Sequence, residues 1–127
     1  MGLAVLCGCA ADGTLSLEDT ALGGDWGGAH VGLTLTAEGG TIRYDCAYGV
    51  LDAPVHRDRA GWFDIEGVHV WEHGGPVRAD EIPDSIPARY LGQVHGDRME
   101  LRVLVGSETL GPFSLRRGAE PWLVRCL

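Results

Sequence analysis

The chain has 127 residues, a length that fits one domain with a hydrophobic core of its own. Its formal net charge is −8, and its ten basic residues are all arginine. This balance argues against a nucleic-acid or anionic-membrane surface, and the absence of lysine excludes Schiff-base chemistry. Hydrophobic residues make up 45 % of the chain, as in folded globular proteins.

Residues 1–11 are small and apolar, and they are too few for a membrane-spanning helix or a whole secretory signal. Leu6-Cys7-Gly8-Cys9 resembles a bacterial lipobox, the motif at the end of a lipoprotein signal. The resemblance implies that Cys9 is lipidated and that the membrane is contacted only through this anchor. We therefore expect an anchor over 1–11, a polar tether over 12–22 and one exported domain over 23–127, at the cell envelope or secreted. The alternative is an apolar leader with two free thiols.

Apolar and polar residues alternate along most of the chain from residue 24, which is the period of β-strands. In the opening strand, 24–36, Val31, Leu33 and Leu35 should share the inner face. The one long loop is 73–86, where the pattern allows at most a single helical turn. Short turns join further strands predicted at 41–46, 48–55, 61–72, 89–94, 98–105, 113–116 and 122–126.

The stretch 61–72 contains a change of phase. Phe63 and Ile65 would share one face of the strand, whereas Val68 and Val70 fall on the other. The change occurs at Gly67, so the sequence predicts a β-bulge at that residue.

About eight short strands joined by hairpin turns predict an all-β fold with little or no helix. A sandwich and a barrel both fit this spacing. Sequential hairpins favour an antiparallel up-and-down barrel, because closure removes the exposed strand edges. The interior of an eight-stranded barrel is either filled by side chains or holds one small ligand.

Gly24-Asp25-Trp26, at the start of the first strand, resembles the G-x-W signature of the calycins, the lipocalin and avidin type of barrel. The resemblance implies that Trp26 closes the barrel floor and that an arginine from a late strand packs across its ring. Arg116, Arg117 and Arg125 are the candidates. Of these, Arg125 lies on the predicted last strand, which should pair with the first strand and close the ring.

A second similarity concerns Tyr44-Asp45-Cys46, which in a small β-rich lipoprotein is similar to bacterial inhibitors of c-type lysozyme. No stretch of the chain matches their inhibitory loop. A disulfide between Cys46 and Cys126 would tie the C-terminus across the barrel seam or the barrel end, and an exported protein permits it. It would close a loop of about 80 residues, worth on the order of 4 kcal/mol. The alternative is two buried free thiols.

Residues 69–73 match the H-x-x-E-H motif of zinc proteases. That chemistry needs His69 and His73 on one helical face, whereas a strand would separate them by about 13 Å. One of these histidines could share a metal with His30 or Glu72, but we expect solvated histidines in this segment, no metal site and no cofactor. The carboxylates that could form a hydrolytic pair are expected on the solvated outer face; they are Asp45, Asp64, Glu66 and Glu72.

The remaining signal is the number of large aromatic side chains for so small a domain. Trp62 and Trp71 lie on opposite phases of one strand, so we expect one in the core and the other at the rim. The ligand-binding set predicted at the barrel mouth is Trp62, Trp71, Tyr44, Tyr90 and His69.

Three functions remain open at this point. The first is a non-catalytic envelope or secreted protein that binds a small apolar or sugar-like molecule in the barrel mouth, with 73–86 as a lid. The second is a protein-interaction or inhibitor module with a filled core, whose partner is an envelope protein. The third and least favoured is a hydrolytic enzyme. Nucleic acid is not expected as a partner.

Overall fold

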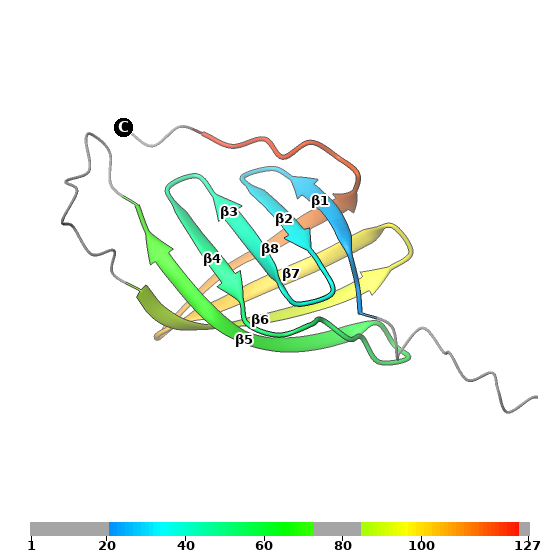
Figure 1. Ribbon diagram of the computed structural model, residues 1–127. Coiled ribbons are helices and arrows are strands. Elements are labelled where there is room, and N and C mark those ends of the chain that lie inside the picture. Colours follow the sequence, from blue (N-terminus) through cyan, green and yellow to red (C-terminus); the bar gives the residue numbers. More distant parts are fainter. Residues whose placement is uncertain (1–20, 73–84, 125–127) are drawn as a thin grey trace, which may run out of the picture.

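The computed structural model describes residues 21–72 and 85–124, and these form a closed barrel of eight strands (Figure 1). Each strand pairs antiparallel with the next, and the last pairs back onto the first. This confirms the predicted antiparallel up-and-down barrel. The strands are β1 (Gly24–Gly28), β2 (Val31–Leu35), β3 (Gly40–Tyr44), β4 (Ala47–Leu51), β5 (Trp62–Trp71), β6 (Ser85–His95), β7 (Arg98–Val105) and β8 (Glu108–Arg117).

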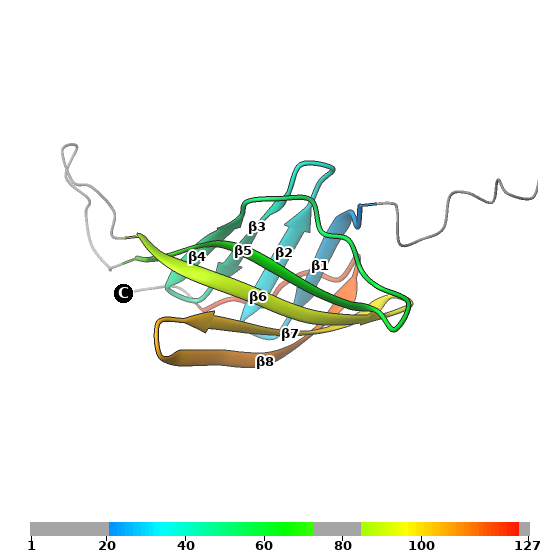
Figure 2. The ribbon, with the colours of Figure 1, turned by 90° about the horizontal axis from the view of Figure 1, so that it is seen from below.

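The wall made by β1–β4 consists of short strands, and the wall made by β5–β8 of longer ones (Figures 1 and 2). No described segment forms a helix with the length and hydropathy needed to cross a membrane. The alternation along β2 is as predicted, because Val31, Leu33 and Leu35 are all buried in the interior.

The opening stretch is a hairpin and not one strand, which corrects the prediction for 24–36. β1 and β2 pair from Gly24 with Leu35 to Gly28 with Val31. The turn between them contains His30, whose φ of 68° lies in the left-handed region. Histidine is among the non-glycine residues that tolerate this region best, and no glycine marks the turn itself. The hairpin therefore leaves little trace in the sequence.

The predicted last strand, 122–126, does not close the ring; β8 does, through pairs of Trp26 with Arg117 and Gly27 with Arg116. Residues 119–124, here called the C-terminal strap, run along the outside of the barrel (Figure 1). Trp122 makes one parallel bridge to Ala29. A Cβ atom on Gly32 would come within 2.8 Å of Pro121, so the strap packs where β2 has no side chain.

The predicted bulge at Gly67 is wrong. Gly67 pairs in unbroken register with Leu51 on one side and Ala88 on the other. The inward phase continues through Gly67 to His69, and Val68 lies on the outer phase. A polar residue inside and a valine outside produced the apparent change of phase. The structure places a register shift instead between β7 and β8, at Leu101/Val103.

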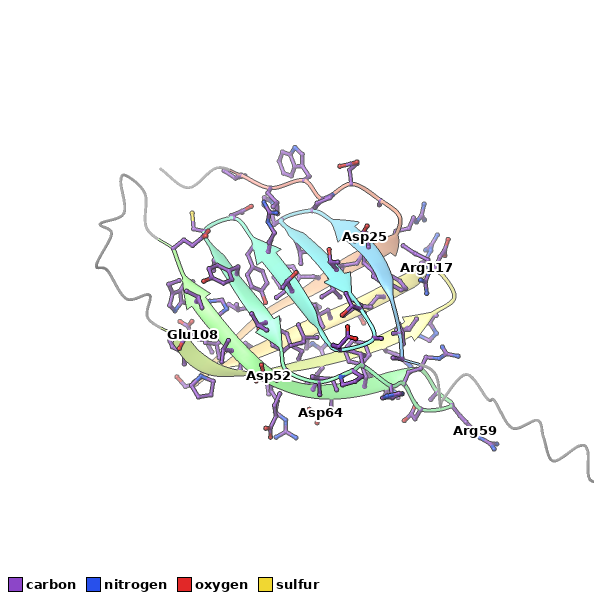
Figure 3. The ribbon with its side chains drawn as sticks, in the orientation of Figure 1. Asp25, Asp52, Arg59, Asp64, Glu108 and Arg117 are labelled. Carbon is purple, nitrogen blue, oxygen red and sulfur yellow. The ribbon has the colours of Figure 1, made fainter. Side chains whose placement is uncertain are left out.

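The two ends of the barrel differ. At one end, here called the floor, β1 begins and β8 ends. At the other end, here called the mouth, β3, β5 and β7 end and β4, β6 and β8 begin. Figure 3 shows Arg117 near the floor and Glu108 near the mouth. The largest fully buried side chains fill the interior between them, and they include Trp26, Tyr90, Ile42, Leu101 and Val103.

Candidate ligand site at the barrel mouth

Trp26 forms the floor of the barrel and is 1 % exposed. Its indole Nε1 donates a hydrogen bond to the Gly23 carbonyl at 3.3 Å. The guanidinium of Arg117 lies 4.4 Å from the Trp26 ring centroid and donates to the same carbonyl at 2.9 Å. Of the three candidate arginines, Arg117 is therefore the one that packs across the Trp26 ring. Arg125 lies outside the described residues.

The floor is also covered by the chain that enters β1. The backbone N–H of Leu22 donates to the Val55 carbonyl at 2.8 Å, and both side chains are buried in the core. The loop between β4 and β5 is thereby held against the segment before β1. The buried side chains of Trp26, Leu22 and Val55 therefore fill the interior at this end of the barrel, and the hollow of about 370 Å³ beside Arg117 is lined by the segment before β1.

Four ring-bearing residues meet at the mouth from three strands. The ring centroids of Tyr44 and His69 are 5.5 Å apart, and those of His69 and Trp71 are 4.3 Å apart in an edge-to-face arrangement. Phe113 lies 5.6 Å from Tyr44. β3 supplies Tyr44, β5 supplies His69 and Trp71, and β8 supplies Phe113.

Among the described residues, His69 is the one polar or charged residue in the buried set, and it has no exposed surface. It faces inward because it continues the phase of Phe63, Ile65 and Gly67 along β5. The prediction of a solvated histidine in this segment is therefore wrong for His69. Burial lowers the pKa of His69, and the nearby Glu108 carboxylate raises it to a smaller extent. The ring is consequently neutral at pH 7.

Neither ring nitrogen of His69 has a hydrogen-bond partner, and the buried hydroxyl of Tyr44 has none. Buried polar atoms in native proteins almost always have a partner in the protein or in bound solvent. An orphaned buried donor or acceptor costs about 1–3 kcal/mol. Three such atoms in adjacent side chains mark the mouth as a place where a hydrogen-bonding group is missing.

Tyr90 lies deeper, and its hydroxyl is satisfied by donation to the Val68 carbonyl at 2.6 Å. A Cβ atom on Gly49 would come within 2.1 Å of this hydroxyl, so the glycine makes room for it. Burial raises the pKa of Tyr90 to about 12. Burial also raises the pKa of Tyr44, with a smaller contribution from the Tyr90 hydroxyl. Both phenols are therefore neutral at pH 7.

Of the five side chains predicted to form the ligand site, the structure brings Tyr44, His69 and Trp71 together and places Tyr90 below them. Trp62 lies apart, at the floor end of β5 and on its outer face. Trp62 is 51 % exposed and Trp71 is 46 % exposed. The expectation that one of the two tryptophans is in the core is wrong. Trp62 and Trp71 are the first and last residues of β5, so both lie at the ends of the barrel wall.

The mouth also contains two residues that the sequence analysis missed. Alternation places Phe113 on a strand but does not locate the register shift between β7 and β8, on which its position at the site depends. Glu108 was assigned to a turn, but it opens β8 opposite Val105 and so lies on the inward phase at the rim. From this position the Glu108 carboxylate raises the pKa of His69, against the larger effect of burial.

Two of the carboxylates predicted on the outer face, Asp64 and Asp45, are engaged by neighbouring groups. Asp64 accepts two hydrogen bonds from Arg89, both at 2.9 Å. Asp45 accepts from the Val124 backbone N–H at 2.7 Å and lies 2.8 Å from His30 Nδ1. Within 21–72 and 85–124, no group of three or more His, Cys, Asp or Glu side chains could hold a metal ion.

Of the cysteines predicted to be bonded or lipidated, Cys46 alone lies within the described residues. Cys46 lies in the bend between β3 and β4 and is half-buried, not on a strand as expected. Cys9 and Cys126 lie outside the described residues, as do His73 and most of the predicted lid. No disulfide joins two residues of the described part.

Comparisons of the chain with protein-family models, curated proteins and solved structures found no match in any of the three. In general shape the molecule agrees with a calycin-like barrel of eight antiparallel strands.

Proposed function

We propose that this protein binds a small, mainly apolar molecule with one hydrogen-bonding group in the mouth of the barrel. The observation that carries the proposal is the set of three buried polar atoms without partners, on His69 and Tyr44. They lie at the end of the barrel that Trp26 and Arg117 do not close. The surrounding rings of Trp71 and Phe113 offer apolar surface to a bound molecule.

The chemistry of the three atoms defines the polar part of the ligand. A neutral imidazole offers one donor and one acceptor, and a neutral phenol offers one of each as well. A hydroxyl, amide or amine group could therefore satisfy both side chains at once. The ligand must be small, because the interior below Tyr90 is occupied by buried core side chains.

Binding fits this arrangement better than catalysis. A general base needs a pKa near the working pH and a positioned partner, and a nucleophile needs activation. His69 has no hydrogen-bonded partner, and burial keeps the Tyr44 phenol protonated. We therefore propose a non-catalytic role.

The proposal is tested by titration with N-phenyl-1-naphthylamine, a neutral aromatic amine whose fluorescence rises in apolar surroundings. We expect saturable binding to the wild type and about tenfold weaker binding to Tyr44→Phe and His69→Leu, because each variant removes about one hydrogen bond. His95→Leu, altered at an exposed position at the floor end, is the matched control and should bind as the wild type does. No saturable binding, or equal affinity in all four proteins, would refute the proposal.

A filled interior also suits the alternative, a protein-interaction or inhibitor module, since such a module needs no cavity. The packed core from Trp26 to Tyr90 is the observation in its favour. Its closest test is an assay of c-type lysozyme with the purified protein. We expect no inhibition, and inhibition at equimolar protein would favour the alternative.

We further propose that the protein is exported and lipid-anchored at Cys9, on the strength of the Leu6-Cys7-Gly8-Cys9 motif. Radiolabelled palmitate fed to a bacterial expression host should label the wild type and Cys7→Ser but not Cys9→Ser. Equal labelling of both variants, or none of the wild type, would exclude the anchor.

A further inference from the structure

A second hollow lies on the outside of the barrel, at the floor end of the longer wall and away from the mouth. Its volume is about 680 Å³, and its lining includes Trp62, His56, Arg57, Asp64, Glu100 and Arg102. β5, β6 and β7 carry most of this surface, and Figure 2 shows these three strands side by side. None of its lining residues belongs to the cluster at the mouth.

Strand register places the polar and aromatic side chains of this hollow in two rows. Trp62 pairs with Gln93, which pairs with Glu100. In the next outward-facing row, Asp64 pairs with Leu91, which pairs with Arg102. Neighbouring strands are about 4.8 Å apart, so Trp62 and Glu100 are separated by about 10 Å across the hollow.

Trp62 is held in its exposed position by the loop before it. The Asp58 carboxylate accepts hydrogen bonds from the backbone N–H groups of Ala60 and Trp62, both at 2.9 Å. The Asp58 N–H donates to the Trp62 carbonyl, also at 2.9 Å. Gln93 donates to the Ala60 carbonyl at 3.1 Å. The backbone under the indole is thus fixed while half of its side chain faces solvent, an arrangement that lowers the entropy cost of binding on it.

The other two exposed tryptophans lack these surroundings. Trp122 is on the C-terminal strap, where its ring packs edge-on against His30 at 5.1 Å. Trp71 packs against His69 at the mouth. Trp62 lines a hollow that also contains both carboxylates and guanidinium groups.

The charges in the hollow select against a charged ligand. Both oxygens of Asp64 are already bound by Arg89, and Asp58 is engaged with its own loop. The remaining charged groups are Glu100 and Arg102, both on the outer face of β7, and Arg57 from the loop before β5. Acceptors and donors are therefore both available, without the single-sign field that attracts an ion.

We propose that this hollow binds a neutral saccharide, with one sugar ring stacked on Trp62 and its hydroxyls hydrogen-bonded to Glu100 and Arg102. A sugar ring presents an apolar face of C–H groups and a rim of hydroxyls that both donate and accept, which matches an indole flanked by a carboxylate and a guanidinium. The span of about 10 Å across three strands suits one to two sugar rings. This site is independent of ligand binding at the mouth.

The test is a titration of ¹⁵N-labelled protein with cellotetraose, maltotetraose and chitotetraose, followed by the indole N–H signals of the tryptophans. We expect at least one of these neutral oligosaccharides to shift the Trp62 signal and to leave Trp26 and Trp122 in place. Affinity should fall about tenfold or more in Trp62→Ala and less in Trp62→Phe, because a smaller ring keeps part of the stacking. Glu100→Gln and Arg102→Leu should each weaken binding as well.

Trp122→Ala is the matched control, since it removes an exposed indole outside the hollow and should bind as the wild type does. Circular dichroism of each variant verifies that the barrel is folded. Two results would overturn the proposal: no shift of the Trp62 signal with any of the neutral oligosaccharides at millimolar concentration, or affinity unchanged in Trp62→Ala. Tighter binding of trigalacturonate or of a glucosamine oligomer than of every neutral probe would overturn the claim of a neutral ligand.

Discussion

At His69 the ligand binding that we propose conflicts with the stability of the free protein. Its side chain is fully buried, and its two ring nitrogens have no partner. A leucine in its place would avoid the cost of about 1–3 kcal/mol for each buried polar atom left unsatisfied. We therefore interpret His69 as a residue that stabilises the bound state more than the free one.

The lowered pKa of His69 predicts how stability depends on pH. The unfolded chain takes up a proton near pH 6.5, whereas the folded protein resists protonation to a lower pH. The neutral ring therefore contributes fully above about pH 6.5, and this stability is lost as pH falls toward the folded-state pKa. We expect the melting temperature to fall between about pH 6.5 and 5, and to fall less steeply in His69→Leu.

Differential scanning fluorimetry across this pH range measures the effect. His56→Leu changes an exposed histidine and should keep the pH dependence of the wild type. A wild type and a His69→Leu variant with parallel pH profiles would show that His69 titrates normally.

Among the structural elements, the β1–β8 seam depends on Arg117 more than on its neighbours. Only two residue pairs join these strands, and Arg117 belongs to one of them. Its side chain adds the contact with the Trp26 ring and the hydrogen bond to the Gly23 carbonyl. We expect Arg117→Ala to lower the free energy of unfolding by about 1 kcal/mol, the size of a cation–π contact at an exposed site.

Arg116→Ala is the matched control, because Arg116 is the adjacent arginine on the opposite phase of β8. It should change stability by less than about 0.5 kcal/mol. Urea denaturation followed by tryptophan fluorescence compares the two. Equal destabilisation by both substitutions would argue against the Trp26 contact as a stabilising element.

The elements that the sequence predicted well are those in which one face is apolar and the other polar. β2 and β7 are of this kind, and the barrel follows from the hairpins between such strands. The strap resembled a strand because Trp122 and Val124 also alternate with other residues. Alternation indicates an extended chain with one buried face. It does not indicate whether that chain pairs within the barrel or runs outside a barrel that β8 has already closed.

The candidate site was harder to predict, for a related reason. The sequence identifies large or polar side chains on strands, but the register of the strands decides at which end of the barrel each one lies. This applies to Tyr44, Tyr90, Trp71 and His69. Trp62 was grouped with them although it lies at the other end of β5. The inward position of His69 was not predicted because its neighbours Val68 and Val70 are apolar. Their phase of the strand was therefore interpreted as the inner one, although it is the outer one.

Beyond β8, the strap brings the chain from the floor back toward the mouth. The N–H of His30 donates to the Trp122 carbonyl at 2.6 Å, and the Val124 N–H donates to Asp45, the residue before Cys46. The strap therefore leads toward Cys46. We predict a disulfide between Cys46 and Cys126 in the oxidised protein, which would stabilise the fold by about 4 kcal/mol.

Peptide mapping without reductant tests this prediction. Trypsin cleaves after Arg43, Arg57 and Arg125, so the disulfide should link residues 44–57 to the dipeptide Cys126-Leu127. Cys46→Ser and Cys126→Ser should then destabilise the protein equally. Alkylation of both cysteines in unreduced, denatured protein would exclude the bond.

We propose that a ligand at the mouth supplies the hydrogen-bond partner that His69 lacks. Long-range ¹H–¹⁵N correlation spectra of the histidine rings test it most directly, with the His69 signals assigned from His69→Leu. We expect a neutral ring at pH 7 whose nitrogen signals move on addition of N-phenyl-1-naphthylamine, while those of His95 do not move. A His69 ring that is protonated at pH 7, or whose signals stay in place while the probe binds, would contradict the claim.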